Sequence, residues 1–129
     1  MTKFSDSPEI HKPYGYSHTA VVPAGTELVF LAGQVGVRPD GSTPATLEEQ
    51  SEQMFNNISA LLRAHGLDAT ALVKITLFVV AGQDIKTVRK ARSKFLGEHK
   101  PTSTAVFVSQ LVDPALFVEC EAIAARTPA

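Results

Sequence analysis

Two segments near the C-terminal end of the sequence carry the pattern that most restricts how the chain can fold. In residues 104–109 and 116–123, every second side chain belongs to the same set, so that each segment has two faces. This is the period of two that a β-strand imposes. Residues 112–114 between them have turn composition, so the sequence predicts a hairpin. Glu119 falls within the second strand, where an unpaired buried carboxylate would cost on the order of several kcal/mol. Glu119 must therefore reach water, a partner or a ligand, and it is the first functional candidate.

The composition limits the class of protein. A chain of 129 residues, 44% of them hydrophobic, is expected to form a single domain over 1–129 with an ordinary core. The 12 basic residues nearly balance the 13 acidic ones, so no global field favours nucleic acid or an anionic membrane as a partner. The apolar runs are too short to span a membrane, and the first residues lack the apolar core of a signal peptide. A cytoplasmic location without a membrane partner is expected.

Cysteine and histidine give no sign of a reactive thiol or a metal site. The single cysteine, Cys120, has apolar neighbours in a predicted strand, which is typical of a buried structural thiol. His18, His65 and His99 are scattered, and no pair has ligand spacing on one helix face. No metal is therefore expected.

The first third of the chain reads as a polar arm followed by a hairpin. Residues 1–15 are polar and interrupted by proline and glycine, which favours a surface arm. The runs 16–22 and 27–34 flank a turn at 23–26 and predict two paired strands. Gly33 lies near the end of the second run, where a ligand or a neighbouring chain could approach the backbone closely.

Two amphipathic helices and a β-branched strand are expected in the middle of the chain. Capping-box spacing of Thr46 and Glu49 begins a helix that Gly66 ends. A second helix is expected from Asp84 to Phe95 or Leu96. A strand is expected between them at 72–80. The side of this strand that should lie beneath the helices carries Val73, Ile75, Leu77 and Val79.

The second helix carries two arginines close to its apolar face. Arg92 falls inside the edge of the apolar arc, and Arg89 flanks it. The lysines of this helix cluster on the opposite side and are most simply a solvated face. Either arginine alone could lay its stem on the core and keep its head in solvent. Because they are three residues apart, both could instead point toward one cleft.

The order strand, strand, helix, strand, helix, strand, strand predicts a two-layer α+β domain, with both helices on one face of a mixed sheet. The other face would carry Leu72, Phe78 and Val80 together with one side of the 104–124 hairpin, and no element remains to cover it. Because a patch of that size is rarely left wet, we expect an oligomer that closes these faces against each other.

Several segments in this order resemble the RidA/YjgF family, over nearly the whole chain from 16 to 124. The matching motifs are GYSHTAVV at 15–22, LAGQVG at 31–36, the helix from 53 to 66, VKITLFV at 73–79, FLGEHKP at 95–101 and VECEAIAA at 118–125. The resemblance implies a chorismate-mutase-like fold and a homotrimer with ligand clefts between subunits.

The resemblance also implies a chemistry. Family members hydrolyse reactive enamines and imines to a keto acid and ammonia without a metal or an organic cofactor. An arginine on the penultimate strand clamps the substrate carboxylate, and a glutamate on the last strand places the attacking water. By motif position, Tyr16 and Glu119 are the catalytic candidates of this chain, and Gly33 and Gln34 contribute to the cleft.

The match is incomplete at the carboxylate clamp. Where the family has its arginine, this chain has Ser103, followed by Thr104, and both remain candidates for substrate binding. One account keeps a catalytic cleft with a different substrate, either neutral or bound by a relocated cation, of which Arg89 is the first candidate and Arg92 the second. The other account is a binding or regulatory module that retained the fold and a small organic acid or imine ligand.

Some family members have been described as ribonucleases or translation inhibitors, so RNA cleavage is a third reading. The slightly negative net charge and the lack of aromatic residues among the lysines of the second helix do not favour nucleic acid.

Overall fold

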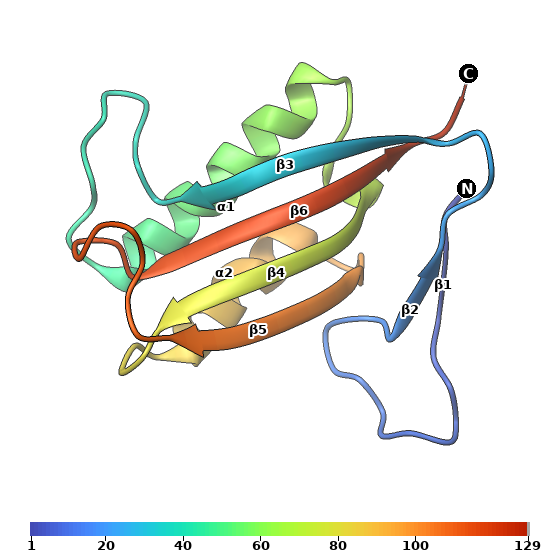
Figure 1. Cartoon of the computed structure of the whole chain (residues 1–129), viewed down its shortest axis with the longest axis horizontal. Helices are drawn as coiled ribbons and strands as arrows, with labels where there is room; N and C mark the ends of the chain where they lie inside the picture. Colours follow the sequence, from blue (N-terminus) through green and yellow to red (C-terminus); the bar gives the residue numbers. More distant parts are fainter. Residues whose placement is uncertain (129) are drawn as a thin grey trace.

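The computed structural model describes residues 1–128 and forms two layers, a mixed sheet with both α-helices behind it (Figure 1). In chain order the elements are β1 (Lys3–Ser5), β2 (Thr19–Val21), β3 (Glu27–Val35), α1 (Leu47–Ala64), the 3₁₀ turn η1 (Ala69–Ala71), β4 (Leu72–Val80), α2 (Ile85–Leu96), β5 (Thr102–Val108) and β6 (Val118–Arg126). The main sheet has the order β3-β6-β4-β5, and β1 pairs with β2 in a separate ribbon. The predicted two-layer α+β class is confirmed.

Both helices begin and end where the sequence predicts. The Oγ1 atom of Thr46 accepts a hydrogen bond from the backbone N–H of Glu49 at 3.2 Å. The carboxylate of Asp84 accepts one from the N–H of Lys86 at 2.9 Å. A glycine with positive φ follows each helix within two residues. Local capping therefore defines both helices.

The core lies between the helices and the sheet. Aromatic stacking of Phe55 on Phe95, with ring centroids 5.1 Å apart, joins α1 to α2. Fully or nearly fully buried members of the core are Met54, Ile58, Leu62, Leu72, Ile75, Leu77, Val79, Val88, Val118, Cys120 and Ala124. The predicted placement of alternate β4 side chains beneath the helices is confirmed from Ile75 onward.

The start of β4 departs from the expected alternation. The pairing of β4 with β6 shifts between Leu72 and Lys74, which leaves Val73 as the extra residue of a bulge. Leu72 is fully buried in the core, so its predicted place on the open face is wrong. Val73 instead lines a surface groove. One inserted residue thus exchanges the faces of two neighbouring side chains.

The predicted C-terminal hairpin is wrong, although both of its strands exist. β4 lies between β5 and β6, is parallel to β5 and antiparallel to β6. The β4-α2-β5 crossover delivers β5 to the sheet edge (Figure 1). The physical reason is the burial of apolar side chains. β4 is more apolar than β5, and a strand inside the sheet, with a neighbour on each side, buries more of its surface than a strand at the edge.

The predicted N-terminal hairpin is also wrong. β3 pairs along its length with β6, and β2 pairs with β1 instead. The arm at 1–15 is therefore not wholly without structure, since its residues Lys3–Ser5 form β1. The long β6 offers β3 a nine-residue partner, which a three-residue β2 cannot match.

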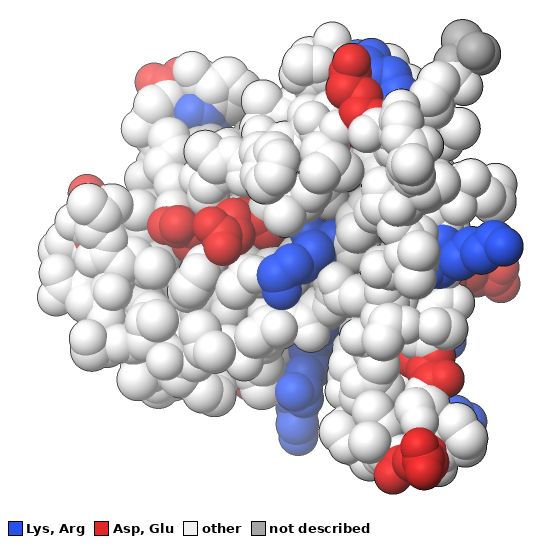
Figure 2. All heavy atoms as spheres, turned by 45° about the vertical axis from the view of Figure 1, so that its right-hand side comes forward, with Lys and Arg blue, Asp and Glu red and all other residues white. Residues whose placement is uncertain are grey.

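The sheet face opposite the helices is uncovered within residues 1–128 (Figure 1). Apolar side chains on it are exposed, with Phe30 at 71% and Val106 at 42%. Figure 2 shows this side as largely uncharged, with only scattered acidic and basic groups. A single copy of the chain thus leaves an apolar surface of the kind that other proteins bury in an interface.

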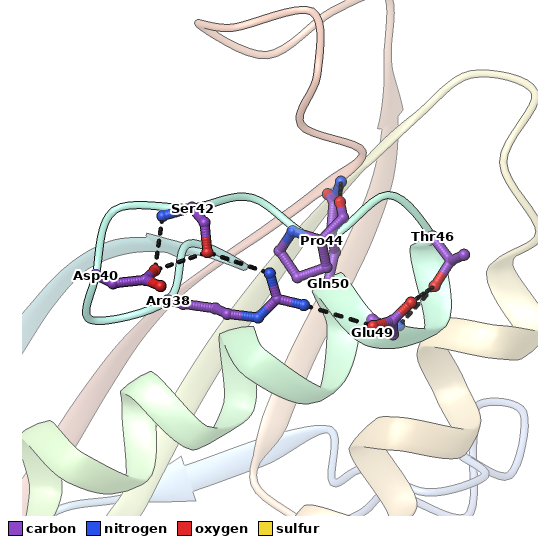
Figure 3. A network of polar contacts seen from close by, with 7 residues as sticks. All are labelled: Arg38, Asp40, Ser42, Pro44, Thr46, Glu49 and Gln50. Carbon is purple, nitrogen blue, oxygen red and sulfur yellow. Dashed lines mark hydrogen bonds and ion pairs between the residues drawn. The ribbon is translucent and has the colours of Figure 1, made fainter.

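Gln50 links α1 to two loops from inside the protein (Figure 3). Its side chain is fully buried, and its Nε2 atom donates to the carbonyls of Pro44 and Ala115 at 3.0 and 2.9 Å. Its Oε1 atom accepts from the N–H of Phe117 at 2.8 Å. Gly36 completes this junction, because a Cβ there would clash with the backbone of Gln50.

Replacing Gln50 with leucine is expected to lower the free energy of unfolding by about 3 kcal/mol, because one buried and two partly buried hydrogen bonds to backbone groups are lost. Urea unfolding at fixed protein concentration measures the change. Gln53→Leu is the matched control, since that amide donates only to Asn57 on the same helix. Equal losses in the two variants would show that the buried network is not responsible.

Candidate functional site

A groove of about 660 Å³ brings together three of the predicted site residues, Tyr16, Ser103 and Thr104. It lies where the segment after the N-terminal arm meets the start of β5. Its other lining residues are Ser17, His18, Thr19, Ala20, Val22, Leu28, Val73, Lys74, Thr102 and Ile123. We name it the β5 groove.

The segment containing Tyr16 is fixed to β5 by its neighbour Ser17. The N–H of Ser17 donates to the carbonyl of Pro101 at 3.1 Å, and its hydroxyl donates to the carbonyl of Lys100 at 2.6 Å. A parallel bridge joins Ser17 to Thr102. These backbone contacts place Tyr16 beside the beginning of β5 without help from its own side chain.

Two histidines that were not predicted to belong to the site, His11 and His18, lie around Tyr16. The Nε2 atom of His11 is within hydrogen-bond distance, 3.3 Å, of the Tyr16 hydroxyl, and the ring of His18 packs edge-on at 5.4 Å. Lys74 is exposed and places the one ammonium group among the lining residues of the β5 groove. The alternation of side chains in β4 assigns Lys74 to the open face, so its position could have been predicted from the sequence. Nothing in the sequence indicated that His11 lies near Tyr16.

A second group gathers Glu119 with Gly33 and Gln34. β3 is irregular between Leu31 and Gln34, where it pairs with β6. The carboxylate of Glu119 lies directly over Gly33, and a Cβ at that position would clash with Oε2. The carboxylate makes no hydrogen bond or ion pair to another residue of 1–128, and it is partly exposed. It is therefore open to a ligand or a water molecule.

The two groups are apart in one copy of the chain. Ser103 pairs with Ile75, whereas Glu119 pairs with Phe78, three residues further along β4. That offset corresponds to about 10 Å along the strand, and β4 itself separates β5 from β6. Because the partner Ile75 faces the helices and Phe78 the open side, the side chains of Ser103 and Glu119 belong to opposite faces of the sheet.

The arginines of α2 differ from each other. Arg89 is exposed and lines neither group, so the structure does not bring it to the other predicted site residues. Arg92 is half-buried, and burial, with a contribution from the charge of Arg89, lowers its pKa below the usual value of a guanidinium. Its Nη2 atom lies 3.0 Å from the position that a Cβ on Gly15 would occupy.

Cys120 is fully buried in β6, as predicted, and burial raises the pKa of its thiol from 9.0 to about 12, with Glu121 and Glu119 adding to the shift.

We expect thiol reagents at pH 8 to leave the native protein unmodified and to label one thiol per chain after unfolding. Because the native thiol keeps its proton where the unfolded one loses it, stability should fall as the pH rises from 9 toward 12. Rapid labelling of the native protein would contradict this placement.

The described part of the chain contains neither a cluster of metal ligands nor a membrane-spanning helix. Among residues 1–128, no cluster of three or more His, Cys, Asp or Glu side chains could hold a metal ion. No helix within the same residues is long and apolar enough to cross a membrane.

Comparisons with known proteins agree with this fold. Residues 7–126 match the family model described as endoribonuclease L-PSP. The chain is 32% identical over 115 residues to a RutC family protein of Pyrococcus horikoshii, covering 88% of this chain and 89% of that protein. It is 34% identical over 103 residues to the 2-iminobutanoate/2-iminopropanoate deaminase of Escherichia coli, covering 77% and 80%. The solved structure of Escherichia coli TdcF with bound serine superposes with a TM-score of 0.73, at 30% identity, over 96% of this chain and 94% of that one. The chain therefore belongs to the RidA/YjgF family.

Proposed function

We propose that the protein is a cytoplasmic homotrimeric hydrolase that converts small enamines or imines to the keto compound and ammonia. The observation that carries this proposal is the carboxylate of Glu119, which lies over the bare backbone of Gly33 and has no hydrogen-bond or ion-pair partner among residues 1–128. The missing side chain at Gly33 lets the carboxylate lie against the strand, and a partly exposed carboxylate without a partner can serve as a general base. The relative named 2-iminobutanoate/2-iminopropanoate deaminase supports the same chemistry.

In the proposed reaction, Glu119 accepts a proton from a water molecule while the water oxygen bonds to the imine carbon. The electron pair of the C=N bond moves to nitrogen, which takes from Glu119 the proton that came from water. In the resulting carbinolamine, Glu119 transfers the hydroxyl proton to the amine nitrogen, so that the C–N bond breaks, ammonia leaves and the C=O bond forms. Tyr16 would pack against the substrate, and Ser103 and Thr104 would offer hydroxyl groups to it. No metal or organic cofactor is needed for this step.

The trimer is part of the proposal because it would unite the two groups of site residues. The β5 groove of one copy and the Glu119 group of the next would then line one cleft. The exposed apolar side of the sheet supports such an assembly. The relative TdcF binds serine, which is a small molecule of the size that such a cleft would hold.

A second candidate is a binding module that holds a small acid without hydrolysing it. It is favoured by Ser103, which the motif resemblance aligns with the family arginine. RNA cleavage, the activity in the description of the family model, is a third candidate that the near-neutral charge does not favour.

The experiment that tests the proposal generates 2-iminopropanoate or 2-iminobutanoate in situ with an amino-acid oxidase and follows keto-acid formation. Native protein is expected to accelerate hydrolysis well beyond the spontaneous rate. A rate equal to the spontaneous one with both imines, combined with calorimetric binding of the keto acid, would favour the binding module. Cleavage of a labelled RNA without imine hydrolysis would favour the third candidate.

A further inference from the structure

Arg92 is a half-buried cation that forms no ion pair within residues 1–128. The carboxylate-bound cations among residues 1–128 are Arg38, Lys94 and Arg126, and no side-chain hydrogen bond of Arg92 is formed within these residues either. The charge of Arg89 acts on it unfavourably and lowers its pKa, in addition to the effect of burial. A guanidinium that is partly desolvated beside a like charge is unfavourable unless an anion compensates it.

The guanidinium lies beside the segment that leads into the β5 groove. Its Nη2 atom is 3.0 Å from the position that a Cβ on Gly15 would occupy, and Tyr16, the next residue, lines the groove. Its charge also acts on Cys120, which lies on the helix side of the sheet. Arg92 therefore lies between the N-terminal segment and the helix side of the sheet.

β5, at the edge of the sheet, is open on the helix side. Ser103, Ala105 and Phe107 pair with Ile75, Leu77 and Val79, which are buried beneath the helices. In contrast to these partners, Ala105 and Phe107 are exposed, Phe107 at 57%. Ser103 lines the β5 groove with a small side chain, and its pairing with Ile75 assigns it to the helix side of the sheet, the side that α2 and Arg92 cover (Figure 1).

We propose that Arg92 binds the anionic group of the ligand, a small 2-keto or 2-imino carboxylate, and so supplies from α2 the charge that Ser103 cannot supply from β5. This inference rests on the proposed function. A planar guanidinium can hold a carboxylate through two parallel hydrogen bonds, which a serine hydroxyl cannot. Arg89 would raise the local positive charge without touching the ligand.

The rival cation is Lys74, which lines the β5 groove from the open face. It is exposed, so water already solvates its ammonium group, and little is gained when it pairs with an anion. Arg92 is partly desolvated before the ligand arrives and gains more from the same pairing. Substitution of Arg92 and substitution of Lys74 are therefore expected to affect the binding of the same ligand differently.

The experiment measures binding of 2-oxobutanoate, by calorimetry on the intact oligomer, to native protein, Arg92→Gln, Lys74→Gln and Lys90→Gln. The Kd is expected to rise about tenfold to a hundredfold in Arg92→Gln and to change less than about threefold in the other two. Adding Ser103→Arg to Arg92→Gln should restore most of the affinity, because the charge returns to the same side of β5. The unligated melting temperature of Arg92→Gln should be equal to or higher than that of native protein, since an uncompensated cation is removed.

The outcomes separate this inference from the proposed function. Loss of binding in Lys74→Gln with native affinity in Arg92→Gln would overturn the inference and leave imine hydrolysis intact. A lower melting temperature or loss of the oligomer in Arg92→Gln would also overturn it, because Arg92 would then be a structural residue. Native protein that binds the keto acid through Arg92 but never accelerates imine hydrolysis would support the inference and contradict the proposed function. Absence of any binding to native protein would contradict the inference.

Discussion

Glu119→Gln is expected to slow imine hydrolysis about 100-fold to 1,000-fold while changing keto-acid affinity less than about threefold. The amide keeps the size of the side chain over Gly33 but cannot accept a proton from water. The loss should therefore appear in kcat and leave KM nearly unchanged. The coupled assay of keto-acid release measures both constants.

Glu121→Gln is the matched control for this variant. Glu121 lies two residues further along β6 and on the same face, and it is exposed. Its replacement should leave kcat within about a factor of two, since the carboxylate that lies over Gly33 is that of Glu119. Equal losses in both variants would indicate a general effect of charge on this face and would remove Glu119 from the chemistry.

Phe30→Lys is expected to dissociate the oligomer into single chains at micromolar concentration and to abolish activity with it. Phe30 is 71% exposed on the open face of the sheet, where it pairs with Ile123. If that face is buried between copies, each lysine would be desolvated without a partner, at a cost of several kcal/mol per copy, on the order of the usual penalty for an unpaired ion. Light scattering coupled to size-exclusion chromatography measures the mass.

Leu61→Lys provides the comparison on the other side of the molecule. Leu61 is also an exposed apolar residue, at 37%, but it lies on α1 in the helix layer. Its replacement should leave the mass at three times that of the chain. A Phe30→Lys protein that remains trimeric would place the interface on a surface other than the open face.

The elements of the fold were readable from the sequence where local signals decide them. Thr46 and Asp84 cap the helices because their side chains satisfy free N–H groups within the same turn. The alternation of β4 gave its buried side from Ile75 onward, because the period of two is intrinsic to a strand. Such features need no knowledge of the rest of the chain.

Strand pairing could not be read in the same way. β5 and β6 follow each other in sequence, yet β4 separates them, because the sheet is decided by which strand gains most from the centre. The bulge at Val73 moved Leu72 into the core, and nothing in the order of apolar residues marks an inserted residue. These features depend on contacts between distant segments.

The candidate site shows the same division. The sequence indicated Glu119 and Gly33, and the structure brings them into contact through β3 pairing with β6. As a relocated cation it ranked Arg89 before Arg92, whereas Arg92 is the arginine that is half-buried and lies beside the N-terminal segment. Helical periodicity indicated the deeper position of Arg92, but its closeness to Gly15 depends on the path of the N-terminal segment, which no local pattern predicts.

The central claim is that each site combines the β5 groove of one copy with the Glu119 group of another. Its most direct test mixes two weakly active variants, Tyr16→Ala and Glu119→Gln, by refolding them together at equal amounts and isolating the mixed trimers through a tag on one variant. Each mixed cyclic trimer has one cleft of three that receives two intact halves, so about a third of the native rate should return. Mixed trimers that form but stay as inactive as the separate variants would contradict the claim.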